Sequence, residues 1–144
     1  MIEPRALNTS CAAGNFIYTS FGKTEPIDLV TVKLERLDAQ ADLQDKITRW
    51  ESISVNMTLI HTRFAAEFVA FSDTEILICG GEGLKIDPEK PAPKFGDAFI
   101  FNAKTKSVQR LQSRLTMDGT EITFAQSAGR GVRISHHHII TLVN

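Results

Sequence analysis

The sequence predicts an all-β protein built from repeated four-stranded antiparallel sheets. Short runs rich in β-branched and aromatic residues alternate with turn-forming residues, which favours strands over helices. The clearest case is residues 63–111, where four apolar runs are separated by turn residues at 72–73, 80–81 and 102. A similar order of features occurs closer to the N-terminus, which indicates an internal repeat.

The first unit is expected over about residues 4–53. Its four predicted strands are 4–13, 15–21, 27–34 and 48–53. The third of these alternates cleanly, with Val30, Val32 and Leu34 on one face. The stretch 35–47 is polar and lacks a good amphipathic stripe, so it is predicted to be an enlarged hairpin loop.

The second unit spans about residues 63–111, and a third begins at about 121 and continues to 144. Predicted strands are 64–71, 75–79, 97–101 and 106–111 in the second unit, and 121–135 and 136–143 in the third. Residues 54–62 and 112–120 connect the units. The connection 82–96 holds three prolines, which stiffen a loop and prevent a regular strand ladder.

In the second unit Gly80-Gly81 ends the second strand, Asp97 leads the third, and Phe101 stands at an aromatic position. In this combination of residues the chain resembles the kelch-repeat family. In the first unit Gly22 and Asp28 stand at the corresponding glycine and aspartate positions, and Trp50 lies in the fourth strand, where it matches Val108. The first unit departs from the pattern in having Phe21-Gly22 instead of a glycine pair, and the second unit has Val108 where the family has Trp.

The resemblance implies a partial β-propeller, with two full four-stranded blades and half of a third in one domain, residues 1–144. Its motif residues would chiefly pack neighbouring blades together, the rings of Trp50 and Phe101 filling the space between them. Propellers are closed rings of roughly four to eight blades. Further blades from the same gene, or oligomerisation, would therefore have to cover the open faces. The alternative fold is a β-sandwich of about ten strands.

Composition excludes some classes of function. The chain has 144 residues, 42% of them hydrophobic and 23% charged, and a net charge of −1. This balance gives no electrostatic reason to expect nucleic acid or an anionic membrane as a partner. No secretory signal or bilayer-spanning run is visible, and Cys11 and Cys79 are expected to be free thiols. A cytoplasmic or nuclear protein is predicted.

No catalytic, cofactor or metal site is predicted. His136 and His138 would share one face of a strand, but a metal site needs a third ligand that nothing in the sequence nominates. The single tyrosine, Tyr18, does not support copper-radical chemistry of the kind found in some propellers that resemble kelch proteins. Gly80-Gly81 is not followed by the helix or the Lys-Ser/Thr of a phosphate-binding loop.

Loops on one rim of the scaffold are the predicted binding surface, because binding residues commonly sit on loops held by a rigid fold. The residues expected to contact a protein partner are Arg63, Lys85, Asp87, Lys90, Lys94, Phe95 and Arg114. The resemblance implies a non-catalytic protein–protein interaction module, such as an adaptor in ubiquitin ligation or cytoskeletal organisation. The alternative is the partial propeller of an enzyme, a phosphatase or oxidase, whose catalytic part lies outside this chain.

Overall fold

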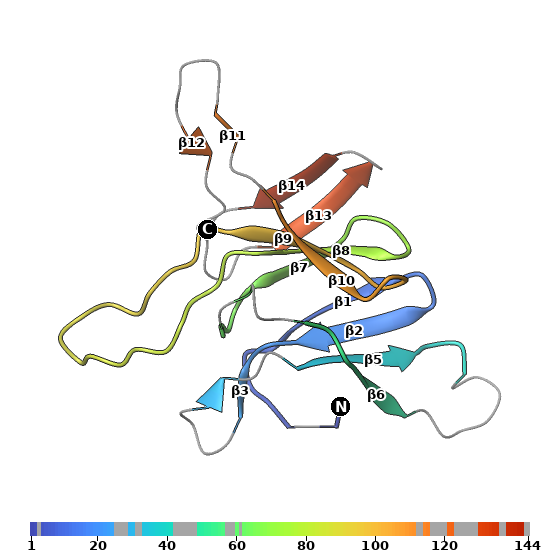
Figure 1. Cartoon of the computed structure of the whole chain (residues 1–144), viewed down its shortest axis with the longest axis horizontal. Coiled ribbons are helices and arrows are strands. Elements are labelled where there is room, and N and C mark those ends of the chain that lie inside the picture. Colours follow the sequence, from blue (N-terminus) through green and yellow to red (C-terminus); the bar gives the residue numbers. More distant parts are fainter. Residues whose placement is uncertain are drawn as a thin grey trace.

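The structure, a computed structural model, describes residues 1–2, 4–24, 29–30, 33–41, 49–56, 60, 62–111, 114–115, 121–122, 130–135 and 138–142. Side chains are described as far as Leu111, apart from those of residues 24, 29 and 30. The described residues form strands and turns without a helix, which confirms the predicted all-β class (Figure 1).

Two antiparallel four-stranded sheets make up most of the fold, one from each complete unit of the predicted repeat. Sheet 1 contains, in order, β1 (Thr9–Ala13), β2 (Phe16–Ser20), β5 (Leu34–Asp38) and β6 (Trp50–Ile53). Sheet 2 contains β7 (Glu67–Ala70), β8 (Glu75–Cys79), β9 (Ala98–Asn102) and β10 (Ser107–Leu111). The strands of each sheet follow one another in sequence order, as hairpin connections dictate.

Three smaller strand pairs accompany these sheets. They are β3 (Lys23–Thr24) with β4 (Leu29–Val30), β11 (Arg114–Leu115) with β12 (Glu121–Ile122), and β13 (Arg130–Ser135) with β14 (His138–Leu142). The single strand predicted over 121–135 is therefore wrong, because its first residues pair with β11 in a separate hairpin. The first strands of the three units are neighbours, since β1 contacts β7 and β7 contacts β13.

The third strand of sheet 1 lies later in the chain than the sequence indicated. It was expected at 27–34 but is β5, which starts at Leu34 and runs through a stretch predicted to be loop. The polar pattern misled because these side chains have partners: Glu35 pairs with Arg5, and Arg36 pairs with Glu51. Asp28, the expected leading acid of this strand, lies outside the described residues.

The main core lies between the two sheets. Alternation sends Ile76 and Ile78 of β8 to this side, where they are fully buried with Phe101 of β9. Aromatic rings join the sheets, with Tyr18 and Phe101 6.2 Å apart between centroids in an edge contact. The expectation that Phe101 packs between neighbouring units is confirmed.

Trp50 does not share that position. It lies directly opposite Leu37 on β5, whereas its strand neighbour Ile53 belongs to the core between the sheets. Since alternate residues of a strand point to opposite faces, Trp50 lies on the face of sheet 1 turned away from sheet 2. Trp50 therefore does not pack between sheets 1 and 2 as Phe101 does.

Sheet 2 has a second buried face, on the side away from sheet 1. Val69, Leu77, Cys79 and Ala98 form a cluster there, with Ile100 and Leu111 packed against it. Because both faces of β8 are buried, its sequence EILIC is an almost continuous apolar run instead of an alternating one.

The backbone conformation at the strand ends also repeats between the two units. Leu7 and Ala65 have φ angles of 54° and 51°, and Phe21 and Gly80 have 58° and 64°. The bridge between Ala6 and Lys23 in the first unit corresponds to that between Phe64 and Glu82 in the second. Phe21 therefore adopts a conformation that favours glycine, and its buried ring packs against Phe68 at 5.8 Å.

Gly22 and Gly81 require glycine for two reasons. Their φ angles are 94° and 95°, which side chains rarely adopt. A Cβ atom at Gly22 would lie 2.7 Å from the carbonyl oxygen of Ala6, and one at Gly81 would lie 2.9 Å from that of Phe64. These predicted motif glycines thus allow the segment before each first strand to approach the end of the second strand.

Truncating the core and the surface isoleucine gives a direct test of this packing. Ile78→Ala is expected to lower the free energy of unfolding by about 2–5 kcal/mol, because the side chain is fully buried between the sheets. Ile86→Ala makes the same chemical change at a side chain that is 92% exposed and should change it by less than about 0.5 kcal/mol. Urea denaturation measures both, and equal losses would contradict the assigned core.

Candidate functional site

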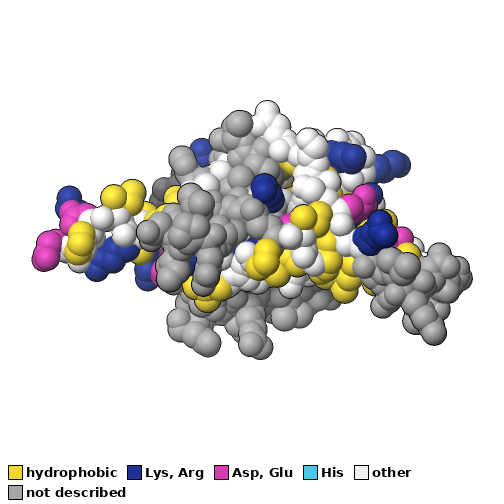
Figure 2. All heavy atoms as spheres, turned by 90° about the horizontal axis from the view of Figure 1, so that it is seen from below, with side chains coloured by type: hydrophobic (Ala, Val, Ile, Leu, Met, Phe, Trp, Pro, Cys, Tyr) yellow, Lys and Arg dark blue, Asp and Glu magenta, His cyan; other side chains and the backbone are white. Residues whose placement is uncertain are grey.

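The connection between β8 and β9 forms a projecting arm, defined here as residues 82–95. Its base is held by backbone pairing: Gly83 N–H donates to the Pro93 carbonyl at 2.8 Å, and Phe95 N–H donates to that of Gly81 at 3.0 Å. Glu82 and Lys94 form a bridge in the same region. The arm extends from one end of the sheets, and Figure 2 shows it standing out at the left of the body.

The tip of the arm is a defined turn. Asp87 Oδ1 accepts a hydrogen bond from the Glu89 N–H at 3.0 Å, and the Asp87 carbonyl accepts one from the Lys90 N–H at 3.1 Å. The Lys90 ammonium lies 3.2 Å from Asp87 Oδ2. Beside this turn Ile86 is 92% exposed, although transferring an aliphatic side chain of this size out of water is favourable by about 1.5–3 kcal/mol.

Arg63 braces the base of the arm from within. Its guanidinium is fully buried and donates to both carboxylate oxygens of Asp97, at 2.6 and 3.2 Å, and to the Gly80 carbonyl at 2.8 Å. The Phe95 ring lies 4.3 Å from the guanidinium carbon, a cation–π distance. The predicted role of Arg63 as a partner contact is therefore wrong, because these groups enclose its side chain.

Most of the other residues that were predicted to contact a partner lie together on the arm. Lys85, Lys90 and Lys94 are exposed on the arm, and Asp87 and Phe95 are half-buried there. Arg114 belongs to β11, at the same end of the sheets, and its side chain lies outside the described part of the chain (Figure 1). The sequence-based prediction missed Ile86, although a large aliphatic residue between Lys85 and Asp87 was a usable signal.

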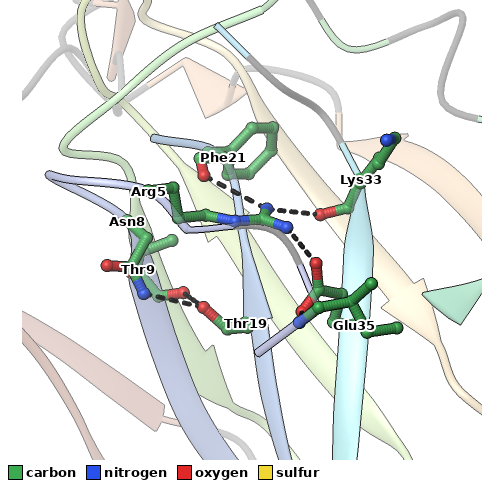
Figure 3. A network of polar contacts seen from close by, with 8 residues as sticks. Arg5, Asn8, Thr9, Thr19, Phe21, Lys33 and Glu35 are labelled. Carbon is green, nitrogen blue, oxygen red and sulfur yellow. Dashed lines mark hydrogen bonds and ion pairs between the residues drawn. The ribbon is translucent and has the colours of Figure 1, made fainter. Parts of the chain in front are cut away.

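The first unit contains a second buried arginine in the corresponding place. Figure 3 shows Arg5 donating to the carbonyl of Phe21 at 3.3 Å, to that of Lys33 at 2.9 Å, and to the carboxylate of Glu35. The Ile2 N–H donates to the other Glu35 oxygen at 2.8 Å. Glu35 thus does in sheet 1 what Asp97 does in sheet 2, the role that the sequence had given to Asp28.

Both cysteines are free thiols, Cys79 buried and Cys11 half-buried. Burial raises the pKa of each from 9.0 to about 12, and for Cys79 the neighbouring Glu67 carboxylate adds to the rise. Such thiols are poor nucleophiles at neutral pH. The described residues contain no group of three or more His, Cys, Asp or Glu side chains placed to hold a metal ion.

Comparison with known proteins shows a similarity of fold. No family model matches the sequence, and no curated protein matches it. Among similar solved structures is one described as the structure of YjhT, with a TM-score of 0.60 and 21% sequence identity. The similarity covers 90% of this chain and 31% of that one, so this chain spans about a third of its length. Among the described residues no helix has the length and apolar character needed to cross a membrane.

Breaking the clamp around Arg63 should be far more costly than breaking an exposed pair. Asp97→Asn leaves a buried guanidinium without its carboxylate, and the free energy of unfolding should fall by about 3–5 kcal/mol. Asp87→Asn makes the same change in the exposed pair with Lys90 and should cost less than about 1 kcal/mol. Chemical denaturation compares the two variants, and a loss at Asp97 no larger than that at Asp87 would show that the clamp does not stabilise the fold.

The raised thiol pKa values predict a loss of stability in alkali. The folded state favours the neutral thiols, so their contribution is complete below the unfolded pKa of 9.0 and disappears as the pH rises to about 12. Thiolate absorbance of the native chain should therefore develop well above pH 9.0. The chain unfolded in denaturant serves as the control, and native titration near 9.0 would refute burial of the thiols.

Proposed function

We propose that the chain is a partial kelch-type β-propeller, in which sheets 1 and 2 are blades and β13–β14 belongs to a third. The repeated backbone geometry supports this assignment. In both four-stranded units a buried arginine precedes the first strand, a glycine with φ near 95° follows the second, and a carboxylate at the third completes the clamp.

The neighbouring first strands support a propeller over a sandwich. Blades of a propeller radiate from a central channel, so their innermost strands are neighbours. The first strands β1, β7 and β13 have this relationship. Sheet 2 also has apolar clusters on both faces, as a blade with a neighbour on each side requires, whereas a sheet of a two-layer sandwich buries one face.

We further propose that this scaffold is a non-catalytic protein-interaction module that binds its partner through the arm. The observation that carries the proposal is Ile86, 92% exposed at the tip of a loop that the fold holds in place. Because the arm is ordered by its backbone pairing and by the clamp at its base, little conformational entropy remains to be lost on binding.

The residues around Ile86 indicate what the partner offers. An exposed aliphatic anchor is complemented by an apolar pocket, and such central anchors dominate binding energy. Lys85 and Lys94 are exposed on the same arm, and neither has a salt bridge in the described part of the chain. A pocket with acidic groups at its rim would therefore suit this arm better than one with basic groups.

Replacing the anchor tests the proposal. Ile86→Asp places a charge where an apolar pocket must receive the side chain, so recovery of a bound protein should fall at least about tenfold. The free energy of unfolding should not change, because the side chain is exposed. Quantitative affinity capture with tagged wild-type and variant chains measures the loss.

A photo-crosslinking amino acid provides the specificity control. Placed at position 86 it should trap one recurring protein, and unlabelled wild-type chain, but not the Ile86→Asp variant, should compete for that protein. Placed at Thr105, an exposed turn residue at the other end of sheet 2, it should not trap the same protein. Identical proteins trapped at both positions, or equal competition by both chains, would refute binding through the arm.

A further inference from the structure

The return leg of the arm, defined here as residues 90–95, has the covalent features of a polyproline II helix. The rings of Pro91 and Pro93 fix their φ angles at about −65°. Lys90 and Ala92 each precede a proline, which confines them to extended conformations of the β or polyproline II kind. Four consecutive residues are therefore kept extended by their own stereochemistry, and none of them belongs to a strand of the structure.

Burial along this leg repeats every third residue. Ala92 and Phe95 are half-buried, and the other residues of the leg are exposed, namely Lys90, Pro91, Pro93 and Lys94. A polyproline II helix has three residues per turn, so residues three apart share one edge. A β-strand would instead alternate at every second residue. The burial pattern therefore indicates a polyproline II helix with one edge against the arm and two edges in water.

The inner edge is held in place by contacts at the base of the arm. The Phe95 ring lies 4.3 Å from the guanidinium carbon of Arg63, and the Pro93 carbonyl accepts a hydrogen bond from the Gly83 N–H at 2.8 Å. A Cβ atom at Gly83 would lie 2.8 Å from Pro93 Cγ, so glycine at this position makes room for the proline ring. The return leg is thus fixed against the outgoing leg, and its two other edges keep one orientation toward solvent.

The two exposed edges carry proline rings and ammonium groups. Counting by three places Lys90 with Pro93 on one edge and Pro91 with Lys94 on the other. Figure 2 shows hydrophobic and basic side chains, yellow and dark blue, gathered on the projecting arm. The ion pair of Lys90 with Asp87 is exposed, so a carboxylate of a partner can replace it at little cost.

We propose that the return leg is a ligand for a domain that binds polyproline II helices in a groove lined by aromatic side chains, with acidic groups beside the groove. Such grooves receive proline rings, and a preformed helix loses little conformational entropy on binding. Lys90 and Lys94 at the two ends of the proline pair favour a groove with carboxylates at its rim. Addition of the leg to a sheet edge is disfavoured, because Pro91 and Pro93 lack the N–H groups that a strand ladder needs.

This inference rests on the proposed function, since it names the kind of partner that the arm would bind. The two can nevertheless fail separately. Ile86 precedes the turn at the tip of the arm, whereas Pro91 and Pro93 follow it. Substitutions on the two legs are therefore independent, and purified domains can serve as probes without the protein captured through Ile86.

The probes are purified, isotope-labelled SH3, WW and EVH1 domains, which bind polyproline II ligands. Each domain is titrated with the full chain up to about 1 mM, and its nuclear magnetic resonance spectrum is recorded. At least one domain should show shifts confined to its aromatic groove. The double variant Pro91→Ala/Pro93→Ala should bind that domain at least about tenfold more weakly, because it lacks both rings and their restraint on the backbone.

Matched variants control for position and charge. Pro88→Ala makes the same chemical change in the turn of the same arm, outside the return leg, and should bind like the wild type. Lys94→Glu reverses a charge on the leg and should weaken binding. Lys104→Glu makes the same reversal in the exposed turn after β9 and should leave binding unchanged.

A wild-type chain that shifts the groove resonances of none of these domains overturns the proposal. Equal binding by the wild type and the double variant overturns it too, as does a loss in Pro88→Ala as large as that in the double variant. Weaker binding by the double variant, with its native circular dichroism spectrum retained and Pro88→Ala unaffected, supports recognition of the return leg.

Discussion

A buried arginine clamped by a carboxylate is the constraint on which the rest of this structure depends. Arg5 and Arg63 each stand before the first strand of a unit and reach the carbonyl that ends the second strand, then the carboxylate at the third. A guanidinium can be fully buried only where its donors meet acceptors, above all an opposite charge. Each clamp therefore ties three segments distant in sequence into one arrangement, and the adjoining glycine with positive φ provides the room.

The clamp of the second unit links the scaffold to the proposed binding arm. Arg63 contacts Gly80 just before the arm begins, and it contacts Phe95 and Asp97 where the arm returns to the sheet. The arm thus leaves and re-enters the fold beside one immobile charged group. This arrangement lets a loop with three prolines and mixed charges hold an isoleucine in water at a fixed position, as an interaction surface requires.

The stacking of repeated sheets is the second constraint on this structure. Because side chains alternate across a strand, each four-stranded sheet has two faces, and in sheet 2 both are apolar and buried. In sheet 1 the apolar residues at the corresponding registers, Ala12, Ile17, Leu37 and Trp50, are exposed or half-buried.

The sequence by itself determined the all-β class, the two repeated units and the burial of Phe101, because strand periodicity and glycines at turns are local signals. It also located five of the exposed or half-buried arm residues, since prolines and charges mark a projecting loop. Only the tertiary structure decided the start of β5, the burial of Arg63 and the outward face of Trp50. Those features depend on partners far along the chain: Glu35 and Arg36 look like loop residues until Arg5 and Glu51 are beside them. Charged side chains carry no local sign of whether water or an opposite charge will surround them.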